Sequence, residues 1–249
     1  MRVLPLALAV SLSGCAPLLH SPTAPPVAPH APGVSVAASG ELSAGPTGRV
    51  EATLAPVAGF GISLAGTLTG DPTLGESEPA TRRTHAARGL EVAAAAAVPL
   101  SRNSAPLRLE LGLGAGRQRV LASGSSGEPL FSGITRFSVE GTVDRLDAHV
   151  GVSGVTRSPS RPWGGDASSV ALLVRASALE GRDVVTVGSG RDRDDAGGVY
   201  LGLVLRADYA YGPLSLETTL GTGDMISGTY RDDYSVPPVH AGLGLRYRF

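Results

Sequence analysis

One short segment carries the three residue types of a hydrolytic triad. Asp147, His149 and Ser153 share one parity within residues 146–155, and apolar residues take the other parity, so in a β-strand the three would lie on one face. In a hydrolytic triad the carboxylate orients the imidazole, and the imidazole activates the hydroxyl for nucleophilic attack. Neighbours two positions apart on one strand face stand about 7 Å apart, too far for direct hydrogen bonds. We therefore expect a solvated wall here and predict no catalytic residue.

Two other patterns could bind an ion or a nucleotide. The sequence Arg-Asp-Arg-Asp-Asp at 191–195 concentrates carboxylates, but two arginines interrupt it and the spacing lacks the glycine and terminal glutamate of an EF-hand loop. The glycine-rich run 112–116 is not followed by a helical pattern, which a dinucleotide fingerprint requires. We predict no metal and no cofactor. The chain has 21 basic and 22 acidic residues and a net charge of −1, which gives no reason to expect a nucleic-acid partner.

The elements that would hold these residues are strands. The last ten residues alternate completely between an apolar and a polar set. Because side chains of a β-strand have a period of two, the two sets would lie on opposite faces. The two sets are Ala241, Leu243, Leu245, Tyr247 and Phe249, and His240, Gly242, Gly244, Arg246 and Arg248. One face of this strand is therefore wholly apolar, and the other carries charge.

Charged residues in earlier segments obey the same alternation. An arginine on the lipid face of a membrane barrel costs about 2–4 kcal/mol at the midplane, so every mid-strand charge should share the polar parity. We predict that the following residues face the interior of a barrel: Glu41, Glu51, Glu91, Arg108, Glu110, Arg136, Glu140, Asp147, His149, Arg175, Arg206, Asp208, Glu217, Arg246 and Arg248.

Alternating segments of about ten residues recur through the chain. We predict about twelve strands, with ten as the alternative, at 33–44, 49–56, 60–69, 89–98, 107–116, 134–143, 146–155, 170–179, 184–189, 198–211, 214–223 and 239–249. Short links, such as Asp144-Arg145 and 180–183, alternate with longer ones, such as 156–169, as in outer-membrane barrels with short periplasmic turns and long external loops. The alanine-rich stretch 92–98 is read as a strand of small residues.

The closing strand, with its carboxy-terminal phenylalanine, resembles that of bacterial outer-membrane β-barrel proteins, and the resemblance covers residues 33–249. It implies an all-β, antiparallel, up-and-down transmembrane barrel in the outer membrane. It also implies contact with outer-membrane lipid and lipopolysaccharide. Recognition by the barrel-assembly machinery would use the apolar face of the last strand, at Leu243, Leu245, Tyr247 and Phe249. No oligomeric state is indicated.

The amino terminus is typical of a secreted lipoprotein. Residues 1–14 have one positive charge and a short apolar run, which predicts a signal peptide. The sequence Leu-Ser-Gly-Cys at 12–15 resembles a bacterial lipobox, which implies lipidation of Cys15, the one cysteine of the chain. Residues 15–32 are rich in proline, favour an extended conformation and predict a linker. An even strand count would leave the amino terminus in the periplasm, where the lipid could reach the inner leaflet.

These features predict a non-enzymatic outer-membrane lipoprotein of structural, surface-interaction or narrow passive-pore type. Aromatic residues make up 4% of the chain, which is few for the aromatic girdles of membrane barrels. Two alternatives therefore stay open. One is an outer-membrane hydrolase or lipid-modifying barrel, and the other is a soluble, lipid-anchored periplasmic barrel that binds a small apolar ligand.

Overall fold

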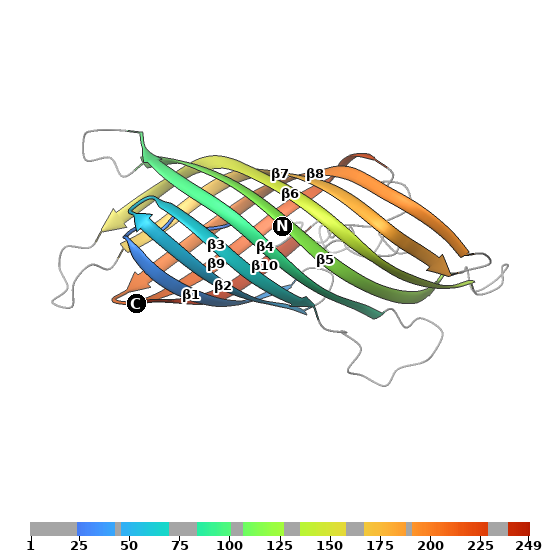
Figure 1. The fold of residues 1–249 in the computed structure, drawn as a ribbon. Helices are drawn as coiled ribbons and strands as arrows, with labels where there is room; N and C mark the ends of the chain where they lie inside the picture. The colour runs from blue at the N-terminus through green and yellow to red at the C-terminus, as the bar shows by residue number, and fades with distance from the viewer. Residues whose placement is uncertain are drawn as a thin grey trace, which may run out of the picture.

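The computed structural model describes residues 24–42, 46–69, 84–100, 107–126, 135–157, 167–187, 191–228 and 239–249. Within these residues the backbone forms ten strands (Figure 1). They are β1 (Gly33–Leu42), β2 (Pro46–Val57), β3 (Phe60–Thr69), β4 (Thr84–Pro99), β5 (Leu107–Ser126), β6 (Thr135–Arg157), β7 (Ala167–Val187), β8 (Arg191–Tyr211), β9 (Leu214–Gly228) and β10 (Val239–Arg248). The described residues contain no helix long and apolar enough to cross a membrane.

The strands close into one antiparallel barrel. Each strand pairs with the next in the chain, and β1 pairs with β10 from Ser35↔Arg248 to Leu42↔Ala241. The Phe249 amide extends this seam by donating to the Val34 carbonyl oxygen at 2.9 Å. Closure satisfies the backbone groups that an open sheet would leave unpaired at its edges. The all-β, antiparallel fold class is therefore as predicted.

The prediction of twelve strands is wrong, and the alternative of ten is correct. Residues 134–143 and 146–155 belong to one strand, β6, which passes through the expected turn at Asp144-Arg145 without interruption. Asp144 pairs across the outer face with Arg117 of β5 at 2.6 Å, and Arg145 points inward. Both charges therefore have partners in mid-strand, which is why two consecutive polar residues do not end the strand here.

A second expected turn, at 180–183, is also part of a strand. β7 continues through it with a register irregularity between Gly181 and Val184. The glycine and the charged residues therefore mark a bulge within the strand and not a turn between two strands. Because the merger at Asp144-Arg145 removes one reversal of the chain, the connection after β6 lies at the same end as the chain termini. The prediction that 156–169 forms an external loop opposite the termini is therefore wrong.

The two ends of the barrel differ. We name the end where β1 begins and β10 finishes the terminal end, and the opposite end the loop end. Strands β5 to β8 are 20 to 23 residues long, whereas β1 and β3 have 10. Figure 1 shows these long strands extending well past the others at the loop end, so the wall is taller on one side.

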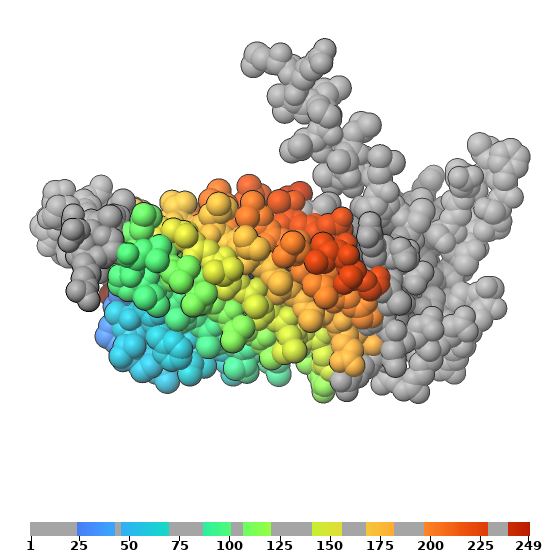
Figure 2. Space-filling view, turned by 90° about the horizontal axis from the view of Figure 1, so that it is seen from above, coloured from blue at the N-terminus to red at the C-terminus, as the bar shows by residue number. Residues whose placement is uncertain are grey.

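The outer surface is apolar, and in Figure 2 it forms one continuous wall on which the colours of successive strands follow one another. Outward side chains such as Leu64, Leu113 and Leu245 are 53–68% exposed. On β5 the apolar outward positions run from Leu107 to 115, and Arg117 follows. Nine residues of a strand tilted by 35–45° cover roughly 25 Å, the height of a bilayer-facing band. The barrel is thus inside out relative to a soluble protein, as transmembrane barrels are.

Glycines on the inner face make room for large side chains of neighbouring strands. His149 of β6 lies opposite Gly112 of β5, and His240 of β10 lies opposite Gly221 of β9. A Cβ atom at either glycine would overlap the imidazole ring of its partner. The rings therefore lie flat against the backbone of the next strand, where a glycine is required.

We predict that Gly112→Ala destabilises the barrel by about 1–3 kcal/mol, because the added methyl group must displace the buried His149 ring. Gly154→Ala is the matched control, since a Cβ there meets no atom within 4 Å. The measurement is the urea concentration at which the folded, heat-modifiable form disappears in lipid vesicles. Equal midpoints for the two variants would contradict the role given to Gly112.

Candidate functional site

The lumen contains most of the charges that the alternation assigns to it. Of the predicted inward residues, nine are buried inside the barrel, Arg108, Glu217 and Arg246 are half-buried, and Arg248 is exposed at the terminal end. The buried ones are Glu41, Glu51, Glu91, Glu110, Asp147, His149, Arg175, Arg206 and Asp208. Arg136 and Glu140 lie in β6, but their side chains are outside the described part of the structure.

Eight of the lumenal charges form one chain of ion pairs. Acid and base alternate along it, so that its four carboxylates balance its four guanidinium groups. In order, the residues are Glu217, Arg246, Glu51, Arg49, Glu91, Arg145, Asp147 and Arg175. The chain connects β9, β10, β2, β4, β6 and β7, and therefore ties together strands far apart in the sequence.

The centre of this chain is Glu91. Its Oε2 atom lies 2.5 Å from Arg145 Nη2 and 3.3 Å from Arg49 Nη1. All three side chains are less than 10% exposed. A buried carboxylate stays charged only if donors replace its lost water, and the fork of an arginine supplies several. The two arginines thus compensate Glu91 from opposite sides.

A separate cluster crosses the lumen from β5 to β8. Arg206 Nη2 lies 2.6 Å from Glu110 Oε2, and Arg206 Nε lies 3.3 Å from Asp208 Oδ2. Ser169 of β7 also donates to Asp208 Oδ2 at 2.8 Å. Because Glu110 and Arg206 belong to strands three places apart in the sheet, their contact bridges the interior and narrows it.

The structure separates the three residues of the apparent triad. Asp147 is bound by Arg145, Arg175 and Ser177. His149 lies over Gly112, and among the described residues the Ser153 hydroxyl makes no hydrogen bond to the imidazole. The carboxylate that would orient the imidazole is therefore engaged by arginines instead.

Residues 24–32, which precede the first strand, lie inside the barrel. The Gly59 amide donates to the Pro29 carbonyl oxygen at 2.7 Å, and the Ala24 amide donates to Glu41 Oε1 at 3.1 Å. Arg49 Nη1 in turn donates to the Ala24 carbonyl oxygen at 3.1 Å. Pro25, Pro26 and Ala28 are buried. We call this segment the lumenal segment; the sequence predicts it as part of a proline-rich linker.

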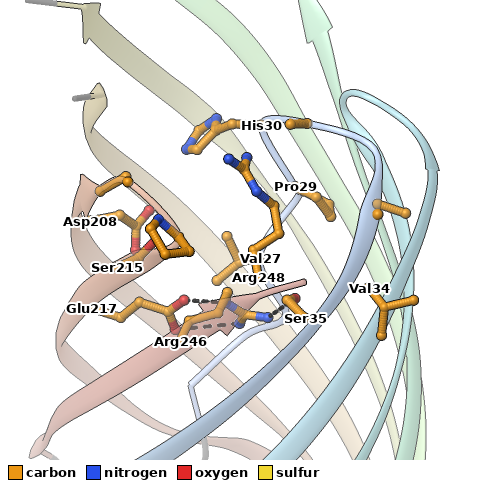
Figure 3. Close-up of a pocket in the computed structure, with 16 residues that line it drawn as sticks. Val27, Pro29, His30, Val34, Ser35, Asp208, Ser215, Glu217, Arg246 and Arg248 are labelled. Atoms are coloured by element: carbon orange, nitrogen blue, oxygen red, sulfur yellow. Dashed lines mark hydrogen bonds and ion pairs between the residues drawn. The ribbon is translucent and has the colours of Figure 1, made fainter. Parts of the chain in front are cut away.

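A cavity of about 250 Å³ separates the lumenal segment from the wall at the terminal end. Figure 3 shows His30 and Pro29 on one side of it and Asp208 on another, with Glu217 and Arg246 at its base. Arg246 also donates to Ser35 Oγ at 3.2 Å. The cavity is therefore lined by both charge signs, with the Glu217–Arg246 ion pair at its base.

Two members of the ion-pair chain, Arg49 and Arg145, were absent from the predicted lumenal residues. Arg145 was assigned to a turn, and Arg49 began a predicted strand. Each shares its parity with a neighbouring inward acid, Asp147 and Glu51 respectively. Extending the alternation through residues 144–145 would have found Arg145.

Other predicted features fall on different parts of the chain. Cys15 and the signal sequence lie outside the described residues, as do the side chains of 191–195. The apolar residues of the last strand face outward, and the rings of Tyr247 and Phe249 meet edge to face at 5.0 Å. Among the described residues, no group of three or more His, Cys, Asp or Glu side chains could hold a metal ion.

No protein-family model and no curated protein sequence matches this chain. Solved structures of similar shape include the translocator domain of autotransporter NalP from Neisseria meningitidis, at 15% identity and a TM-score of 0.49, covering 87% of this chain and 89% of that one. LpxR from Salmonella typhimurium is 11% identical with a TM-score of 0.44, covering 86% and 100%. KdgM porin is 13% identical with a TM-score of 0.32, covering 86% and 99%. Identities this low assign no activity to this chain.

We predict that Glu91→Gln lowers the free energy of unfolding by about 3–5 kcal/mol, because it leaves Arg49 and Arg145 without the carboxylate between them. Arg117→Gln is the matched control. It breaks the exposed Arg117–Asp144 pair on the outer face and should leave stability unchanged. Urea titration of the folded band in vesicles measures both, and a Glu91→Gln midpoint equal to that of the wild type would disprove the role of the chain.

Protonation of His30 should release the lumenal segment. Burial lowers the pKa of His30, Asp208 opposes this shift, and Arg108 and Arg206 add to it. Arg108 Nη1 lies 3.3 Å from His30 Nδ1, a contact that needs an unprotonated ring nitrogen. The released segment takes up a proton more readily, so docking is complete above about pH 6.5 and weakens as the pH falls.

The measurement is ion conductance of the reconstituted barrel between about pH 8 and pH 5. We expect openings to become more frequent in acid for the wild type. His30→Gln, which stays neutral, should show no such increase, and an identical acid response in both would assign the effect to another group.

Proposed function

We propose that this protein is a non-enzymatic outer-membrane barrel whose lumen is closed at rest by its own lumenal segment. Its role is structural or surface-interacting, and the loop end faces the cell exterior. The long strands β5 to β8 then project beyond the bilayer on the outside and offer a raised wall to partners.

The observation that carries this proposal is that both charged side chains and the lumenal segment occupy the lumen. Charged side chains meet across the interior, as Glu110 and Arg206 do, and residues 24–32 occupy space beside them. A ten-stranded barrel encloses more room than one of eight strands, whose side chains about fill the interior. The extra room is taken up by a peptide segment, which supports a closed barrel rather than an open pore.

A gated pore is the second candidate. The lumenal segment is attached to the wall by few hydrogen bonds and belongs to no strand of the sheet. Such a segment can leave the lumen without breaking the barrel, which favours a passive pore that opens only when the segment is displaced.

The outer face of the barrel supports a proposal for the molecules that it contacts. Arg88, Arg117 and Arg119 point outward next to one another on β4 and β5, beyond the apolar band, where phosphate groups of outer-leaflet lipopolysaccharide would lie. We also propose that the apolar face of β10 is the surface recognised during assembly, and that Cys15 is lipidated. The described residues offer no observation that favours a hydrolase.

Planar-bilayer recording tests the closed barrel. We expect the wild type to be silent at neutral pH and a variant lacking residues 24–32 to conduct steadily, since the deletion removes the segment that fills the lumen. A variant lacking residues 16–23 is the matched control, because it shortens the same region but keeps the lumenal segment. Steady conductance of the wild type would disprove closure, and silence of all three would show that side chains alone close the lumen.

A further inference from the structure

We infer that the chain leaves the lumen at the loop end, so that the residues before Ala24, Cys15 among them, are delivered to that side of the membrane. The lumen is then a passage for the protein's own amino terminus. Which side of the membrane this is rests on the proposed function, whereas the exit at the loop end does not.

The lumenal segment is fixed at the terminal end by its last residues. Pro29 accepts a hydrogen bond from Gly59 in the turn between β2 and β3. A Cβ atom on Gly61 would come within 2.8 Å of the Pro29 ring, so the ring lies directly against the backbone there. His30 and Ala31 line the cavity at the same mouth, beside the turn at Gly212.

Its first described residue lies near the other end. Both backbone groups of Ala24 are held, the amide by Glu41 and the carbonyl oxygen by Arg49. Glu41 is the ninth of the ten residues of β1 and pairs with Thr47, the second residue of β2. Between residues 33 and 24 the chain therefore travels inside the lumen along nearly the whole length of β1.

The dimensions agree with a single crossing. The five steps from Pro29 to Ala24 rise about 16 Å in polyproline conformation at 3.1 Å each, and the stretch of β1 from Ser35 to Glu41 covers about 15 Å of barrel height once the strand tilt is included. Pro25, Pro26 and Pro29 have no amide hydrogen, so most of the segment needs no backbone acceptor from the wall. A proline-rich strand can thus cross the lumen where an ordinary extended peptide would leave buried donors unpaired.

A return to the terminal end would require a second crossing. The nine residues 15–23 reach at most about 30 Å when fully extended, so they would need to run straight back beside the first pass. The cavity next to Ala24 and Pro25 has a volume of about 30 Å³, which is room for a water molecule, so a second pass would have to find its space elsewhere in the lumen. Under this inference, a lipid on Cys15 would be held at the loop end, which differs from the periplasmic anchor expected from the sequence.

Cysteine labelling in intact cells tests this inference. Ser21→Cys places a thiol three residues before Ala24, and a membrane-impermeant maleimide reports which side it reaches. Ser227→Cys, an exposed position near the loop end of β9, and Ala58→Cys, an exposed position in the turn at the terminal end, are the matched controls. The wild type measures any labelling of Cys15 itself, and the heat-modifiable band selects folded protein.

We expect Ser21→Cys to follow Ser227→Cys, with both labelled in intact cells and Ala58→Cys labelled only after permeabilisation. If Ser21→Cys instead follows Ala58→Cys, the chain turns back and the inference is overturned. Labelling in neither condition also overturns it, because residue 21 would then still be inside the lumen. If Ala58→Cys is the surface-labelled control, the proposed orientation fails, and the exit is judged by the control that Ser21→Cys then follows.

Discussion

Every charge inside this barrel must find a partner inside it. The strand period of two leaves only two destinations for a side chain, and lipid excludes charge from one of them. All ionic residues of the membrane-crossing stretches therefore gather in a space a few side chains wide, where water is scarce. Isolated ion pairs would leave some guanidinium donors and carboxylate lone pairs without partners. In the alternating chain from Glu217 to Arg175, most of these groups contact two partners instead of one.

The same crowding explains why the lumenal segment fits. It brings almost no charge into the interior, apart from the titratable ring of His30, and its prolines bring few amide donors. It takes up backbone contacts from Glu41 and Arg49, and so uses polar groups that the wall already provides. An interior built of ion pairs thus accepts a peptide with few charges and few amide donors more readily than a charged peptide, whose side chains would compete with the existing pairs.

The sequence contains the pattern of inside and outside but not the number of strands. The face on which a side chain lies follows from its position in the alternation of its own strand. Arg108, Arg175 and Arg246 could therefore be assigned to the lumen without knowledge of the neighbouring strands. Whether Asp144-Arg145 makes a turn depends on Arg117 and Glu91, which belong to other strands. The position of residues 24–32 was beyond prediction for a related reason. Proline-rich composition indicates an extended chain, and only the shape and donors of the assembled lumen determine where that chain lies.

The seam between the first and last strands has a consequence for biosynthesis. Arg246, near the carboxyl end, pairs with Glu51 on β2 and with Glu217 on β9. Without the final strand, Glu51 keeps only its ion pair with Arg49, and Glu217 loses the arginine that pairs with it among the described residues. Closing the barrel and pairing the acid of its ninth strand are therefore one event, because the strand that completes the sheet also brings in Arg246.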